Sequence, residues 1–102
     1  MKRTGSNAVL VCYDVTSDRL RRLIDKCLKD FGVRLQFSVF LCHLNDIGTV
    51  QCRNSLLKLL EKYRKETSEN DSLIIFNYVN TGAVDCLIGE KIDQEPTAFQ
   101  IF

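Results

Sequence analysis

Apolar positions near the N-terminus of this sequence predict a short buried strand. Residues 8–14 read AVLVCYD, six apolar or aromatic residues in a row that end in a carboxylate. Because apolar residues do not alternate with polar ones here, the run is typical of a strand covered on both faces. Asp14 then marks the point where the strand surfaces, and ligands of open α/β sheets gather at such ends. Asp14 is therefore the first candidate for chemistry.

Two stretches repeat their apolar residues at the helical period. Thr16 and Ser17 offer N-cap hydroxyls for the first helix, and we predict that Gly32 ends it as a left-handed residue. Its stripe is Leu20, Leu23, Ile24, Cys27, Leu28 and Phe31. A second helix is predicted after a turn at residues 45–48. Its stripe is Cys52, Leu56, Leu59, Leu60 and Tyr63, and its outer face is basic.

The remaining apolar runs predict strands. Residues 33–44 alternate and indicate one long strand, in which Ser38 leaves open a bulge or a break. Residues 73–79 and 84–88 are short β-rich runs around a turn that contains Gly82, which predicts an antiparallel hairpin. A charged linker, residues 89–96, leads to a last predicted strand, residues 98–102. That strand either pads an edge of its own sheet or adds to the sheet of a second subunit.

This order of elements predicts an α+β fold of the ferredoxin-like kind, with an antiparallel sheet and two helices on one face. All 102 residues are expected to form one domain. Because two helices cover only one face of a sheet, something else must cover the other face. A homodimer packed through that bare face is the economical answer.

The composition indicates the cellular compartment of the protein more than its function. The formal net charge of +1 does not argue for nucleic-acid binding, which must rest on where Arg and Lys cluster. The five cysteines form no CxxC pair and are odd in number, which fits neither a disulfide framework nor a zinc ribbon. They look like small core residues in a reducing cytoplasm. No apolar run approaches the length of a membrane span, so we expect a cytoplasmic protein without a membrane partner.

Asp14 could bind a metal ion, because hard carboxylate oxygens suit Mg²⁺ or Mn²⁺. One carboxylate alone is a weak metal site, and a homodimer would supply a second copy of it. The alternative is structural, in which Asp14 caps the following turn near Thr16 and Ser17.

Four arginines, Arg19, Arg21, Arg22 and Arg34, form a basic neighbourhood that lies close to Asp14 if the first two strands are adjacent. Phosphates would be drawn to such a cluster. The alternative is a solvated helix face with local pairs at i+4, such as Asp18 with Arg22 and Asp25 with Lys29.

Two motifs carry a family resemblance. YDVTSDRLRR at residues 13–22 and RLQFSVFLC at residues 34–42, with Gly32 between them, resemble the small CRISPR-associated endoribonucleases, the Cas2 family. The resemblance implies a ferredoxin-like homodimer in which Asp14 binds a divalent metal between subunits. It also implies that a further set of residues serves activity or builds the inter-subunit cleft. These are Tyr13, Arg21, Arg34, Ser38 and Phe40. Leu41 and Leu23 depart from the family pattern, which often has Glu at the first position and in some members Arg at the second.

The resemblance implies a Mg²⁺-dependent endonuclease for single-stranded RNA or duplex DNA that acts with the Cas1 integrase in spacer acquisition. In this interpretation the nucleic acid contacts Arg19, Arg21, Arg22, Arg34 and Ser38. The alternative is a non-catalytic dimer that binds duplex DNA and bridges integrase dimers, in which Asp14 performs no chemistry. A third class is a dimeric regulatory domain that binds a small molecule on its bare sheet face.

Overall fold

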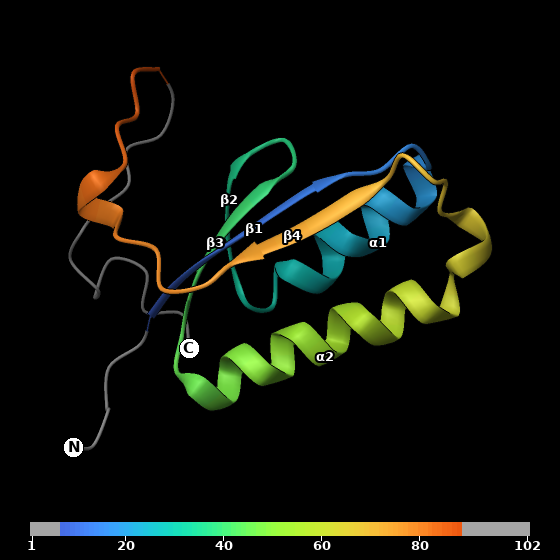
Figure 1. Ribbon diagram of the computed structural model, residues 1–102, viewed down its shortest axis with the longest axis horizontal. Helices are drawn as coiled ribbons and strands as arrows, with labels where there is room; N and C mark the ends of the chain where they lie inside the picture. The colour runs from blue at the N-terminus through green and yellow to red at the C-terminus, as the bar shows by residue number, and fades with distance from the viewer. Residues whose placement is uncertain (1–6, 89–102) are drawn as a thin grey trace.

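The computed structural model describes residues 7–88 of the chain (Figure 1). Four strands form one antiparallel sheet in the order β2-β3-β1-β4. The strands are β1 (Asn7–Asp14), β2 (Gly32–Gln36), β3 (Val39–Leu44) and β4 (Ser72–Phe76). Helices α1 (Asp18–Leu28) and α2 (Asp46–Lys62) lie on the same face of the sheet. The element order βαββαβ is the ferredoxin-like one, and the predicted α+β class with its antiparallel sheet and two helices is confirmed.

Side-chain caps set the starts of both helices. The Ser17 Oγ accepts a hydrogen bond from the backbone N–H of Leu20 at 3.1 Å, as its position in the sequence predicts. The Asn45 Oδ1 accepts from the N–H of Gly48 at 2.7 Å, so the expected turn at residues 45–48 is the first turn of α2. The described chain contains no helix long and apolar enough to cross a membrane.

The long strand predicted over residues 33–44 is broken at Ser38. Phe37 and Ser38 form the turn of a hairpin between β2 and β3, and the pairing register shifts between Arg34 and Gln36. The predicted role of Gly32 is wrong, because α1 ends at Leu28 and Gly32 begins β2. Gly32 is needed for close approach instead, since a Cβ there would lie 2.6 Å from the Cys42 Sγ.

The predicted hairpin between residues 73–79 and 84–88 is also wrong. Strand β4 pairs with β1, and residues 84–88 form no strand. Tyr78 has a positive φ of 58°, and the Asn80 Oδ1 accepts from the N–H of Gly82 at 3.0 Å. The Asn80 carbonyl also accepts the N–H of Ala83 at 2.9 Å in a short 3₁₀ turn, η2 (Thr81–Ala83). This segment projects beyond the sheet instead of reversing along it (Figure 1). The predicted linker at 89–96 and strand at 98–102 lie outside the described residues.

The core lies between the sheet and the helices. The inward residues of β1 and β3 meet the apolar stripes of α1 and α2 there. The most buried contributors are Val9, Val11, Tyr13, Phe40, Cys42, Leu44, Leu20, Ile24, Leu28, Cys52 and Leu56. Cys42 and Cys52 are therefore core residues, as predicted, whereas Cys12, Cys27 and Cys86 are only partly buried.

The helices do not cover the opposite face of the sheet, which is apolar; its side chains on β4 are half exposed, whereas Leu41 of β3 is buried. One row of paired residues crosses all four strands through Val33, Leu41, Leu10 and Phe76. Ile74 lies on the same face of β4, and its exposed fraction and that of Phe76 are both 50%. We call this surface the open face, and Asp14 lies at one end of it, paired with Ser72.

We predict that Gly32→Ala destabilises the protein by about 1–3 kcal/mol, as overpacking of a filled site typically does. The added methyl group would collide with the carbonyl oxygen of Leu41 and would lie 2.8 Å from the Cα of Cys42, where backbone atoms cannot move aside cheaply. The measurement is the free energy of unfolding in urea. Gly48→Ala is the control, because its nearest contact is the Asn45 side chain at 3.2 Å. Equal losses in the two variants would contradict the prediction.

Candidate functional site

Asp14 ends the central strand β1 with an exposed side chain. Within residues 7–88, its carboxylate accepts no hydrogen bond and forms no ion pair. The alternative that it caps the following turn is wrong, because the N–H and hydroxyl of Thr16 both donate to the Asp71 Oδ1 at 2.9 Å. Ser17 in turn caps α1. The fold therefore leaves the Asp14 carboxylate available for a ligand.

Asp71 ties the loop after Asp14 to the loop that precedes β4. Besides Thr16, its carboxylate accepts the N–H of Ser68 at 2.9 Å and the Ser68 hydroxyl at 3.0 Å. The hydrogen bonds from the backbone N–H groups of Ser68 and Thr16 hold the pKa of Asp71 below its ordinary value. The β1–α1 loop is thus fixed by a charged acceptor from a distant part of the chain.

Glu66 fixes the start of α1 from the same side. Its Oε1 accepts from the Ser17 hydroxyl at 2.9 Å, and its Oε2 pairs with the Arg19 Nη1 at 3.1 Å. The Arg19 guanidinium also lies 5.2 Å from the centroid of the Tyr63 ring. Arg19, predicted to contact nucleic acid, is therefore already engaged within the chain.

Arg21 and Arg22 differ in their surroundings although they are neighbours. Arg21 pairs with Asp18 and lies 5.2 Å from the centroid of the Phe37 ring. Asp18 therefore pairs at i+3 instead of with Arg22 at i+4. Arg22 is exposed, and no described residue forms an ion pair with it.

Tyr13, Arg34 and Phe40 meet around Asp25, a residue of α1. The Tyr13 hydroxyl donates to the Asp25 Oδ1, and the Arg34 Nη2 lies 2.7 Å from the Asp25 Oδ2. The Arg34 guanidinium covers the Phe40 ring at 5.5 Å, and the Tyr13 and Phe40 rings stack with centroids 6.5 Å apart. Burial, followed by the hydrogen bond to Asp25, raises the pKa of Tyr13 well above its ordinary value.

Sequence reasoning missed Asp25, which it paired with Lys29. The available signal was Tyr13 itself, because a buried tyrosine hydroxyl usually finds a polar partner. Asp25 directly follows the buried Ile24 at the edge of the apolar stripe, where a carboxylate can reach the sheet. Ser38 helps to position Tyr13 through its backbone, since its carbonyl accepts the N–H of Tyr13 at 3.1 Å.

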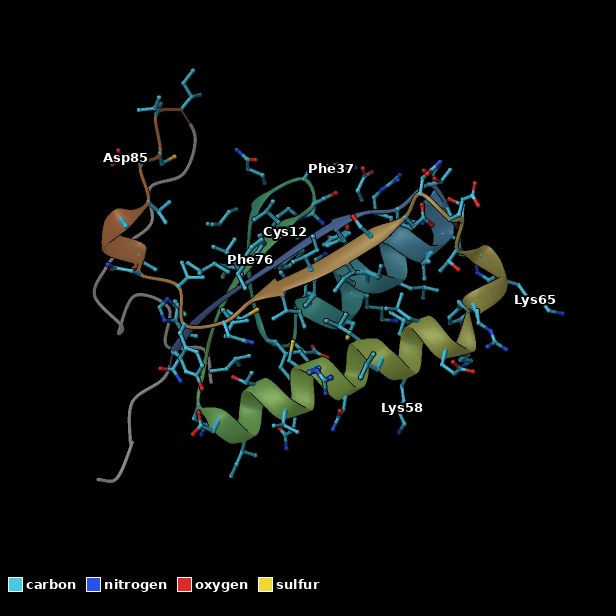
Figure 2. The ribbon with its side chains drawn as sticks, in the orientation of Figure 1. Cys12, Phe37, Lys58, Lys65, Phe76 and Asp85 are labelled. Atoms are coloured by element: carbon cyan, nitrogen blue, oxygen red, sulfur yellow. The ribbon has the colours of Figure 1, made fainter. Side chains whose placement is uncertain are left out.

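The predicted basic residues do not form one cluster. Arg19 joins Glu66 and Tyr63, Arg21 joins Asp18 and Phe37, and Arg34 joins the Asp25 group. The exposed residues of α2 include Lys58 and Lys62 but also Glu61, and Lys58 projects away from the sheet, as does Lys65 of the 3₁₀ turn η1 (Arg64–Glu66) that follows the helix (Figure 2). Arg19 and Arg21 are thus fixed at the start of α1 and Arg34 is fixed farther along it at Asp25, while exposed lysines lie on α2.

The donor set of one chain suits a metal only in part. The described residues contain no cluster of three side chains that could hold a metal ion. Mg²⁺, however, often binds through one or two carboxylates and completes its shell with water and substrate phosphates. Asp14 fits as one such ligand because its oxygens are hard and exposed and have no other partner among residues 7–88.

This α+β topology, with Asp14 at the end of an inner strand, agrees with one protein family. A family model described as CRISPR associated protein Cas2 matches residues 7–82. The chain belongs to this family. A CRISPR-associated endoribonuclease Cas2 of Thermodesulfovibrio yellowstonii is 29% identical over 91% of this chain and 93% of its own length. One of Korarchaeum cryptofilum is 35% identical over 72% of this chain and 74% of its own.

Solved structures show the same fold. Cas2 of Streptococcus pyogenes matches with a TM-score of 0.54 and 28% identity, over 68% of this chain and 82% of that one. A hypothetical protein of Thermus thermophilus, TT1823, matches with a TM-score of 0.58 and 28% identity, over 84% and 96% of the two chains. Both likenesses agree with the fold, and the first is to a protein of the same family.

We predict that Asp71→Asn lowers thermal stability at neutral pH and removes a pH-dependent part of it. The pKa of Asp71 is depressed in the folded protein, so its contribution is present above the unfolded-state pKa and is lost as pH falls through the folded one. Melting temperatures measured from pH 7 down to pH 3 test this. Asp85→Asn, on the projecting segment in Figure 2, is the control. Identical pH profiles for the two variants would contradict the prediction.

Proposed function

We propose that this chain is a metal-dependent endonuclease that hydrolyses phosphodiester bonds of RNA or duplex DNA during CRISPR spacer acquisition, together with the Cas1 integrase. The observation that carries the proposal is the exposed Asp14 carboxylate at the end of β1, to which the described fold gives no structural partner. The relatives support it, since they are named endoribonucleases.

The residues of the chain divide the work by position. Asp14 would hold Mg²⁺ or Mn²⁺, which when bound would supply an activated water and charge neutralisation at the phosphate. Arg22 and the exposed lysines of α2 bind phosphate oxygens, because no described residue pairs with the Arg22 guanidinium. Arg21, stacked on Phe37 and paired with Asp18, orients the backbone of the substrate beside α1.

A second copy of the chain would complete this site. The open face carries an apolar row across all four strands, which is the kind of surface that a homodimer buries. Asp14 lies at the end of that face, so a two-fold axis that runs along the strands would place the two Asp14 residues at the same end of the assembly. Two carboxylates then serve one metal site, which answers the single-ligand weakness of one chain.

We predict that Asp14→Asn lowers the rate of Mg²⁺-dependent cleavage by at least about 100-fold, because even outer-shell partners of metal ligands cost about 10–100-fold. The amide keeps the shape of the side chain and loses the charge. Cleavage of labelled RNA and duplex DNA is measured with Mg²⁺ and with a chelator. Asp85→Asn, which changes the same charge far from β1, should cleave as the unmodified protein does. Undiminished cleavage by Asp14→Asn would refute the assignment.

The alternative function is a non-catalytic dimer that binds duplex DNA and bridges Cas1 dimers. The exposed Lys58 and Lys62 of α2 favour it, because they offer sequence-independent phosphate contacts that need no metal ion at Asp14. The same variant separates the two functions. An adaptor retains DNA binding and spacer acquisition in cells when Asp14 is changed to Asn, whereas a required nuclease loses acquisition.

We predict that Ile74→Asp converts a homodimer into single chains. The exposed fraction of Ile74 is 50%, and its position on the open face would place a charge inside the proposed interface. Light scattering should change from the mass of two 11.7 kDa chains to that of one. Ile47→Asp is the matched control, because Ile47 is 69% exposed on α2, outside that face. A dimer that persists in Ile74→Asp while remaining folded places the interface elsewhere.

A further inference from the structure

Three residues that the family resemblance links to activity lie together in this structure, and two of them, Tyr13 and Arg34, share one carboxylate. Tyr13 comes from β1, Arg34 from β2 and Phe40 from β3, and all three lie around Asp25 of α1. The two oxygens of Asp25 are divided, one accepting the Tyr13 hydroxyl and the other the Arg34 guanidinium at 2.7 Å. A single helical residue thus connects β1 and β2, which are not neighbours in the sheet.

The surroundings of this group limit what its members can touch. Tyr13 is 4% exposed and Phe40 is fully buried, so neither ring offers a surface to a large substrate. The side chain of Arg34 is 37% exposed, yet its charge is paired with a carboxylate whose own side chain is 15% exposed. One side of the guanidinium also lies over the Phe40 ring. Hydrogen bonding and ring contact together hold Arg34 against the domain.

We propose that Asp25 is a positioning residue that holds Tyr13 and Arg34 inside the domain, so that these residues shape the site and do not contact nucleic acid. The inference deepens the proposed function, on which it rests for its nucleic-acid measurement. Arg34 is thereby removed from the predicted phosphate contacts, and Arg22 remains the arginine beside α1 that has no ion-pair partner among residues 7–88.

The first test measures how the affinity for RNA and duplex DNA depends on salt. Each lost phosphate contact lowers the slope of log affinity against log salt by about 0.9 on duplex DNA and about 0.7 on single strands. Arg22→Gln should show this decrease, whereas Arg34→Gln, with the same change of charge, should leave the slope unchanged. Asp25→Asn should raise the slope because it frees the Arg34 guanidinium, and Asp25→Asn with Arg34→Gln should restore it. A decrease in Arg34→Gln equal to that in Arg22→Gln would overturn the proposal.

The second test needs no nucleic acid. Unfolding equilibria of Asp25→Asn, Arg34→Gln and the double variant form a double-mutant cycle, in which we expect a coupling of about tenfold in the unfolding constant. Additive effects would overturn the proposal. If Asp25→Asn does not fold, Tyr13→Phe replaces it in the cycle, because that change removes only the hydroxyl that bonds to Asp25. Coupling of Tyr13→Phe with Arg34→Gln then supports the shared anchor, and additivity opposes it.

The two tests also separate this inference from the function that it extends. If no variant binds RNA or DNA, the proposed nuclease and adaptor functions both fail, and the cycle alone decides the role of Asp25. If binding is present and the Arg34→Gln slope falls, the proposed function stands and the positioning role fails.

Discussion

The pairing of β1 on both of its edges is the constraint on which the rest of the structure depends. Residues 7–12 pair with β3, and residues 10–14 pair with β4, so the first strand becomes the centre of the sheet. Its inward side chains then pack against both helices and its outward ones form the middle of the open face. Asp14 reaches the surface at the C-terminal end of β1, because its partner Ser72 is the first residue of β4.

Strong local periodicity made much of this arrangement predictable. The stripe from Leu20 to Leu28 marks α1, and the Ser17 hydroxyl marks its start, since both signals lie within a few residues of the element that they specify. Residues 8–14 identify β1 for the same reason. The apolar row on the open face follows from having two helices and one sheet, whatever the details of the loops.

The errors arose where pairing across the chain decides the outcome. Alternation continues through Ser38, so only the register of β2 against β3 shows that the strand turns there. Residues 84–88 are β-rich, yet β4 already has β1 as its partner, and the N–H of Val79 still donates to the carbonyl of Ala8 on that strand. The site followed the same rule. Asp14 was found from its own strand, whereas the Asp25 contact with Arg34 joins a helix to a strand and depends on side-chain geometry.

The carboxylates around β1 differ in the hydrogen-bond donors that they meet within the described chain. Asp71 and Glu66 hold the β1–α1 loop by accepting hydrogen bonds from Thr16 and Ser17. Asp25 accepts from Tyr13 and Arg34 in a half-buried position. Each of these three carboxylates accepts hydrogen bonds from at least two donor groups. Asp14 meets none among the described residues and keeps its water. A carboxylate in that state, at the end of a strand held rigid by its neighbours, can exchange water for a metal ion without disturbing the fold.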